Sequence, residues 1–211
     1  MNHLKSALVI SLVAFQSLFA AVHGKTVALF DGKTFKGWEG DTAKTFRVQD
    51  GAIVGGTLHD KIPRNEFLRT TRSYTNFVLT LKFKLVGGEN ANGGVQIRTK
   101  SLPGNNEVSG YQADLGDPGW WGSLYDESRR NKVLAKSDME AVNKVLKRGD
   151  WNDYKIRCEG KRIQLWINDV QTVDYTETDP NIENHGIIAI QIHAGPPSEA
   201  WYKDFQIQEL P

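Results

Sequence analysis

Apolar and polar residues alternate along most of this chain. In residues 77–85 the apolar positions Phe77, Leu79, Leu81 and Phe83 are separated by valine, threonine and lysine. A period of two places successive side chains on opposite faces, so this segment is predicted to be a strand with one buried face. The same pattern recurs in residues 46–49, 52–54, 65–70, 95–98, 111–115, 154–158, 163–167, 170–175, 186–193 and 201–210.

The spacing of these segments predicts the fold class. Asp50-Gly51 separates two of them and is a dipeptide that favours a tight hairpin. Helical spacing is found in residues 137–147, which we expect to form one short helix. Many short strands with almost no helix indicate an all-β sandwich of two antiparallel sheets.

Three of the predicted strands carry polar pairs at the i, i+2 spacing. The members of each pair point to the same face of their strand. If the three strands are neighbours, the pairs form one polar face. An ordinary solvated face is the alternative, but such faces carry Lys, Thr and Ser more often, so we favour a site. The pairs are Gln96 with Arg98, Gln112 with Asp114, and Gln191 with His193.

An aromatic and charged segment follows the Gln112–Asp114 strand. Asp117-Pro118-Gly119 interrupts the strand, and rings and forked hydrogen-bonding groups come directly after it. Flat rings beside charged donors suit sugar binding, although either tryptophan alone is more typical of a plug for the core. The residues concerned are Trp120, Trp121, Tyr125, Arg129 and Arg130.

Composition and charge limit the function classes. The chain has 211 residues and a formal net charge of +1, which gives no electrostatic reason to expect nucleic acid as a partner. Cys158 is the only cysteine, so no intrachain disulfide forms, and its place in the alternation predicts a buried thiol.

The first 24 residues have the pattern of a secretory signal peptide. A short basic start precedes an apolar run and small residues near position 24. The run is shorter than the roughly 20 residues that span a bilayer. We therefore expect export to the periplasm or beyond, no membrane attachment after signal removal, and a single domain over residues 25–211.

The polar face offers groups for acid–base chemistry. His193, Asp114 and Glu66 are the candidates for moving protons, and amide side chains suit sugar hydroxyls. Binding of a divalent metal by the same three residues is an alternative, but their spacing in the sequence matches no recognised ligand pattern. Zinc patterns, phosphate-cradling glycine loops and a serine nucleophile elbow are absent from the sequence.

Many ordered segments resemble one known family. Between about residues 28 and 210 the chain is similar to the 3-keto-disaccharide hydrolase domain, also described as 3-keto-glucoside-1,2-lyase and 3-keto-2-hydroxy-glucal hydratase. The resemblance implies a concanavalin A-like jelly roll. The segments that carry it are LFDGKTFKGW, FRVQDGAIVGG, NEFLRT, GVQIR, GYQADLG, GWWGSLYDESRRN, GDWNDYKIRCEGKRIQLWINDVQTVDY and GIIAIQIHAGPP.

The resemblance implies chemistry on glycosides that another enzyme, a sugar C3 oxidoreductase, has already oxidised. A C3 ketone acidifies the C2 proton, so that a base removes it and the C1 aglycone leaves. We expect His193 or Asp114 as the base and Glu66 as a second acid/base or metal ligand. We expect the substrate-binding residues to be Gln96, Arg98, Gln112 and Gln191, with Tyr125, Arg129 and Arg130 closing the pocket and Trp120 or Trp121 stacking on the ring.

Three alternatives remain open. A non-catalytic carbohydrate-binding module needs aromatic residues but no acid/base groups. An ordinary glycoside hydrolase needs paired carboxylates, and the nearest match to the three-acid strand motif, Glu177-Thr178-Asp179, lacks the third acid. A structural or adhesion domain would show a flat apolar patch instead of convergent polar groups.

Overall fold

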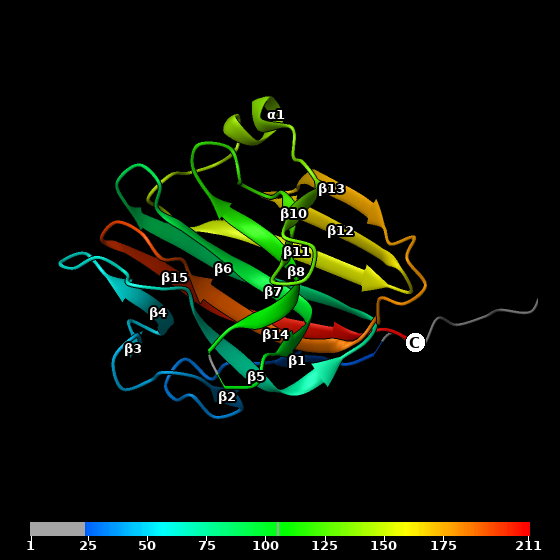
Figure 1. Ribbon diagram of the computed structural model, residues 1–211, viewed down its shortest axis with the longest axis horizontal. Helices are drawn as coiled ribbons and strands as arrows, with labels where there is room; N and C mark the ends of the chain where they lie inside the picture. The colour runs from blue at the N-terminus through cyan, green and yellow to red at the C-terminus, as the bar shows by residue number, and fades with distance from the viewer. Residues whose placement is uncertain (1–23, 105) are drawn as a thin grey trace, which may run out of the picture.

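The protein is a sandwich of two antiparallel sheets, seen in a computed structural model that describes residues 24–104 and 106–211. Figure 1 shows the two sheets as facing layers, with the single labelled helix outside them at one end. The expected all-β fold class is thereby confirmed. The expected signal peptide falls on residues 1–24 and so lies, except for Gly24, outside the described residues.

Sheet A forms one layer. Its strands, in spatial order, are β13 (Val170–Thr176), β12 (Arg162–Ile167), β11 (Asn152–Glu159), β6 (Phe77–Gly87), β15 (Ser198–Glu209), β4 (Ala52–Thr57) and β3 (Phe46–Gln49), and β1 (Thr26–Ala28) also pairs with β15. The hairpin of β3 and β4 turns at Asp50 and Gly51, whose φ angles are 51° and 72°. The predicted Asp-Gly hairpin is therefore confirmed.

Sheet B forms the other layer and carries the predicted polar pairs. Its strands, in spatial order, are β10 (Lys132–Ala135), β9 (Leu124–Glu127), β8 (Val108–Gly116), β7 (Asn92–Ser101), β14 (Gly186–Ile192), β5 (Glu66–Tyr74) and β2 (Trp38–Glu39).

The core lies between the two layers. Phe77, Leu79, Leu81 and Phe83 of β6 are all buried in it, as their alternation predicts. Cys158 is also buried there, and burial raises the pKa of its thiol to about 12, so the group is neutral at ordinary pH. Among the described residues, none of the helices has the length and apolar character that crossing a membrane requires.

The helix α1 (Met139–Asn143) is shorter than the predicted segment 137–147. Asp138 caps it, because its side chain accepts hydrogen bonds from the backbone N–H groups of Glu140 and Ala141. After Asn143 the chain continues as turns. The side chain of Asn152, the first residue of β11, accepts a hydrogen bond from the backbone N–H of Lys147 and donates one to the C=O of the same residue. That contact holds the loop to sheet A and ends the helix early.

A cluster of ion pairs joins the two sheets along one edge. Arg130, which follows β9, donates to the buried carboxylate of Asp126 and, at 2.6 Å, to Glu177, which follows β13. Glu177 also accepts hydrogen bonds from Tyr111 at 2.7 Å and from Tyr175 at 3.1 Å. Burial opposes ionisation of Glu177, but the bonds from Arg130 and Tyr111 outweigh it and hold its pKa well below the ordinary value.

Replacing Glu177 with Gln should weaken this edge. We expect Glu177→Gln to lower the free energy of unfolding at pH 7 by about 1 to 3 kcal/mol, the usual cost of breaking a buried charged hydrogen bond. A carboxyl with a lowered pKa stabilises the fold above its unfolded pKa and loses that contribution as the pH falls. The deficit should therefore shrink below pH 4.5, which urea unfolding at pH 7 and pH 3 measures. Glu159→Gln, in an exposed pair with Arg157, is the matched control and should change little.

Candidate functional site

Three neighbouring strands of sheet B place the predicted polar pairs side by side. β7 lies between β8 and β14, with Gln96 opposite Gln112, and with Gly94 between Asp114 and Gln191. The core takes the alternate residues Val95, Ala113 and Ile190, so these polar side chains lie on the outer face. The prediction that the three strands are neighbours is confirmed.

A directed chain of hydrogen bonds fixes the centre of this face. The Thr99 hydroxyl donates to Gln96 Oε1 at 3.1 Å, and Gln96 Nε2 donates to Gln112 Oε1. Gln112 Nε2 then donates to Asp114 Oδ1 at 2.5 Å. Each amide uses its oxygen to accept from one side and its nitrogen to donate to the other, so the orientation of both glutamines is set by their neighbours. Gln96 is fully buried and supports Gln112 from behind.

A pocket of about 200 Å³ opens beside Asp114, and we call it the polar pocket. It brings together two carboxyl groups, a histidine, two amides and two aromatic rings. The lining residues are Asn92, Gln112, Asp114, Trp120, Tyr125, Glu127 and His193. Five residues predicted for the polar face or the aromatic segment thus meet in this pocket: Gln112, Asp114, Trp120, Tyr125 and His193.

Asp114 has a strongly altered acidity. Burial, opposed by the hydrogen bond from Gln112 and assisted by the nearby charge of Glu127, raises the pKa of this carboxyl from 3.8 to about 8. The side chain is only 3% exposed. At neutral pH Asp114 therefore carries a proton, and it acts as a hydrogen-bond donor or acid.

Glu127 faces the pocket from β9. Its pKa is raised, chiefly by burial and then by the charge of Glu107, while His193 lowers it. Gln191 Nε2 lies 3.4 Å from Glu127 Oε2, so Gln191 supports Glu127 and does not itself line the pocket. Glu127 and Asn92 were not among the site residues predicted from the sequence. Glu127 stands two residues after Tyr125 on one strand, and this spacing already places the two side chains on one face.

His193 directly follows β14 and is held in one tautomer. Its Nδ1 lies 2.6 Å from the carbonyl oxygen of Ala194. A carbonyl oxygen only accepts, so Nδ1 carries the hydrogen, and in the neutral ring Nε2 keeps a free lone pair. Its backbone N–H donates to Asn92 O at 3.1 Å, which ties the residue to β7. His193 thus presents a base on the wall of the polar pocket.

Arg98 does not share the face of Gln96, and the prediction that it does was wrong. The pairing of β7 with β8 shifts register after Ile97, and Arg98 has a φ of 50°. This bulge turns the side chain away, where it donates to the backbone carbonyl oxygens of Thr75 and Gly160 at 2.6 to 2.8 Å. Arg98 therefore links β7 to loops at the sheet edge.

Arg129 and Arg130 do not close the pocket, contrary to expectation. Both donate to the carboxylate of Asp126, which is fully buried on the inner side of β9. The guanidinium of Arg129 also lies 4.4 Å from the centre of the Tyr111 ring. These two arginines belong to the edge cluster that joins the sheets.

The two neighbouring tryptophans have different environments. Trp121 is 3% exposed and stacks on Phe83 in the core, and its Nε1 donates to Asp117 at 2.9 Å. Trp120 is 38% exposed and lines the polar pocket. Trp121 thus fills the core, as a single tryptophan was expected to do, and Trp120 is the ring that a sugar can reach.

Glu66 does not line the polar pocket. Its carboxylate accepts hydrogen bonds from Arg64 at 2.6 Å and from Asn106 at 2.8 Å. Within residues 24–104 and 106–211, no group of three or more His, Cys, Asp or Glu side chains is arranged as a metal site. His193, Asp114 and Glu66 therefore do not form the ligand set that we considered.

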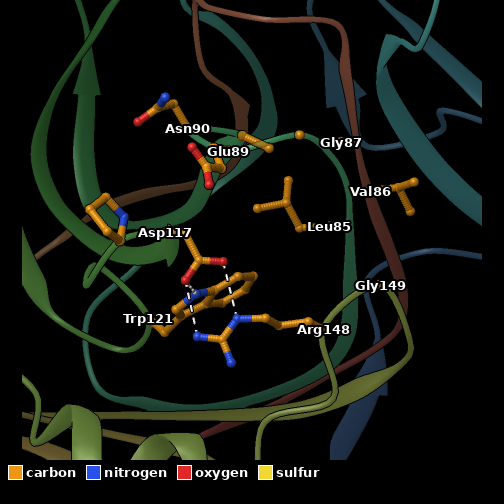
Figure 2. Close-up of a pocket in the computed structure, with 12 residues that line it drawn as sticks. Leu85, Val86, Gly87, Glu89, Asn90, Asp117, Trp121, Arg148 and Gly149 are labelled. Carbon is orange, nitrogen blue, oxygen red and sulfur yellow. Dashed lines mark hydrogen bonds and ion pairs between the residues drawn. The ribbon is translucent and has the colours of Figure 1, made fainter.

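A larger cavity, of about 770 Å³, lies on the other side of the segment 117–121. Asp117 and Arg148 form a two-pronged ion pair along it, with contacts of 3.0 and 3.1 Å, and Figure 2 shows them facing each other with Trp121 beside them. Asp117 is paired with Arg148, and the other carboxyl group of the lining, Glu89, lies on an exposed loop. No histidine lines this cavity, so we place the chemistry in the smaller polar pocket.

Comparison with known proteins agrees with this reading of the fold. Residues 25–208 match the 3-keto-alpha-glucoside-1,2-lyase-like domain. The chain belongs to this family. A search of the curated proteins gives no match.

Solved structures of other proteins have the same sandwich fold. A "putative glycosyl hydrolase" from Parabacteroides distasonis is 19% identical, with a TM-score of 0.67 over 89% of this chain and 94% of that one. A galectin-like protein of unknown function from Bacillus subtilis is 11% identical, with a TM-score of 0.65 over 89% and 96%. The carbohydrate-binding module CBM66 from Bacillus subtilis is 13% identical, with a TM-score of 0.59 over 81% and 94%. At these identities the likeness extends to the fold alone.

The raised pKa of Asp114 predicts a stability effect. A carboxyl that ionises near 3.8 when unfolded and near 8 when folded binds more protons in the folded state, so the fold loses stability as the pH rises from about 4 to 8. Asp114→Asn keeps an oxygen for Gln112 but removes the buried charge. We expect this variant to be more stable than the wild type at pH 8 by about 5 kcal/mol, and nearly equal to it at pH 4.

Urea unfolding at the two pH values measures this difference. Asp60→Asn, on an exposed loop, is the control and should show no such pH dependence. If Asp114→Asn is equally destabilised at both pH values, the carboxyl is ionised in the folded protein and our assignment is wrong.

Proposed function

We propose that the polar pocket cleaves glycosides carrying a ketone at C3, by removing the C2 proton and expelling the C1 aglycone. The observation that carries this proposal is the joint presence of a neutral buried acid, Asp114, and a histidine base of fixed tautomer, His193, in one pocket. Membership of the 3-keto-alpha-glucoside-1,2-lyase-like family supports it.

His193 is the base in this proposal. The ketone makes the C2 proton acidic, and Nε2 takes that proton while the C2–H electrons move into a C2=C3 enolate. The enolate electrons then return to form C1=C2, and the C1–O bond breaks with its electrons going to the aglycone oxygen. That oxygen takes up a proton, so the products are an alcohol and an unsaturated 2-hydroxy-3-keto sugar, with no net change of oxidation state.

Asp114 is the group that stabilises the enolate in this proposal. A carboxylic acid that stays neutral at pH 7 donates a hydrogen bond to a developing oxyanion, and burial strengthens that bond. The chain from Thr99 through Gln96 and Gln112 keeps the carboxyl in place. A protonated Asp114 directed at the C3 oxygen would thus stabilise the enolate without a guanidinium.

The remaining pocket residues suit sugar recognition. Asn92, Gln112 and Glu127 offer groups that bond hydroxyls, and the exposed ring of Trp120 offers a flat apolar face. Water added across C1=C2 of the product would complete a net hydrolysis, with the hydroxyl on C1 and the proton on C2. The C3 ketone itself must come from a separate sugar oxidoreductase, because this reaction requires a ketone that it does not make.

An ordinary glycoside hydrolase is the second candidate. The observation that favours it is the presence of two carboxyl groups, Asp114 and Glu127, in one pocket. The two candidates differ in the substrate that they require: the elimination needs the ketone, and an ordinary hydrolase cleaves the unoxidised glycoside.

The decisive assay compares a 3-keto-glucoside with its unoxidised parent. We expect aglycone release, and deuterium exchange at C2 in heavy water, with the keto substrate alone. His193→Ala should lower both by at least about 100-fold, the usual range for loss of a general base. His59→Ala, in an exposed loop, is the matched control and should keep full activity. Release from the unoxidised parent would favour the ordinary hydrolase, and saturable binding without turnover of either sugar would make the domain a binding module.

The pH profile tests Asp114 separately. Because the acid form is the active one, kcat/KM for the keto substrate should fall as the pH rises through about 8. In Asp114→Asn the side chain no longer titrates, so this alkaline decline should disappear while the overall rate drops. A decline at pH 8 that persists unchanged in Asp114→Asn would assign it to another group.

A further inference from the structure

A second, apolar groove adjoins the polar pocket, and we call it the side groove. It has a volume of about 280 Å³ and lies over the segment 118–123 and the edge strand β10. Its lining residues are Pro118, Gly119, Trp120, Ser123, Val133 and Lys136. Trp120 lines both the side groove and the polar pocket, so the two spaces adjoin at this residue.

The register of sheet B joins the two spaces a second time. Val133 of β10 is paired with Tyr125 of β9, and Tyr125 is paired with Gln112 of β8. Paired residues point to the same face, so Val133, Tyr125 and Gln112 form one row across the outer face. The row begins in the side groove and ends in the polar pocket.

Exposed apolar side chains are concentrated here. Among the described residues, four large hydrophobic side chains are exposed: Trp120 at 38%, Val133 at 37%, Val27 and Leu58. Val27 belongs to β1 and Leu58 directly follows β4, both strands of the other sheet. Single exposed apolar residues are normal, but two that line one groove beside a polar pocket are typical of a ligand-binding surface.

The walls of the groove are held in place by hydrogen bonds. The backbone N–H of Trp120 donates to Gly116 O at 3.0 Å, and that of Ser123 donates to Trp120 O at 2.9 Å. Ser137, beyond β10, donates from its hydroxyl to Trp121 O at 2.7 Å and so ties the two walls together. A ligand in such a groove needs little ordering of the protein.

We propose that the side groove binds the aglycone of the substrate and that it selects an aromatic one. This inference rests on the proposed function, because the aglycone is the group expelled from the sugar in the polar pocket. Ring burial against Trp120, Pro118 and Val133 favours an aryl group over a small alkyl group. Lys136 is the one charged residue among those that line the groove, so an anionic ring is favoured over a cationic one.

The test compares benzyl and methyl 3-keto-glucosides with the full chain. Benzyl alcohol and methanol are leaving groups of similar acidity, so a difference in rate reports binding of the ring. We expect kcat/KM to be at least about tenfold higher for the benzyl substrate. Val133→Asp should remove that preference and leave the methyl substrate within about twofold of the wild type.

Control variants separate the groove from the fold. Val27→Asp introduces the same change at an exposed position outside the groove and should leave the preference intact. Val133→Ala should reduce the preference partly. For charge, the wild type should prefer a 4-carboxybenzyl over a 4-aminomethylbenzyl aglycone, and Lys136→Met should abolish that difference.

Binding measurements distinguish failure of the groove from failure of the reaction. If no keto substrate is turned over, but benzyl glucoside binds more tightly than methyl glucoside and Val133→Asp removes the difference, the groove is supported and the reaction is refuted. Turnover with equal kcat/KM for the two aglycones would refute the groove and leave the reaction standing. A Val133→Asp variant that loses both substrates equally would also refute it.

Discussion

A carboxyl group buried on the outer face of a sheet is the constraint on which this site depends. Asp114 is almost fully shielded from water, and a charge there is costly, so the group stays protonated to about pH 8. It also needs a defined partner, which Gln112 supplies. Gln112 in turn needs space, and β7 provides it with a glycine: a Cβ on Gly94 would lie 2.8 Å from Gln112 Cγ. The composition of the neighbouring strand is thus set by the position of one carboxyl.

The period-two alternation predicted most of the fold and the centre of the site. Strand facing depends only on counting residues, so the pair of Gln112 with Asp114, and the facing of Gln96 and Gln191, could be predicted from the sequence. The short helix was predicted too long, because the loop contact between Asn152 and Lys147 is a tertiary interaction that periodicity does not contain. The facing of Glu127 could have been predicted by the same counting, since this residue stands two positions after Tyr125.

The orientations of Arg98, Arg129 and Arg130 could not be predicted from this alternation. Facing rules assume an unbroken strand, and the bulge after Ile97 reverses the direction of Arg98. Arg129 and Arg130 lie in the turn after β9, where no period applies, and their direction is decided by the buried carboxylates of Asp126 and Glu177. A charged side chain orients toward its partners, and two of these partners, Glu177 for Arg130 and Gly160 for Arg98, are 47 and 62 residues away in the sequence. The different exposures of Trp120 and Trp121 likewise depend on tertiary structure, because they follow from how the turn that contains both residues packs against the sheets.

The orientation of these arginines affects the charge of the polar pocket. None of the residues that line the polar pocket, all within the described part of the chain, is a lysine or an arginine. A guanidinium beside Asp114 would favour its charged form and bring its pKa back toward the ordinary value. Because the bulge turns Arg98 away from the outer face and the edge cluster holds Arg129 and Arg130, the carboxyls of the pocket share it with amides, aromatic rings and one histidine. The same contacts that fasten the two sheets thus keep cations away from Asp114, and a neutral acid remains beside a histidine base.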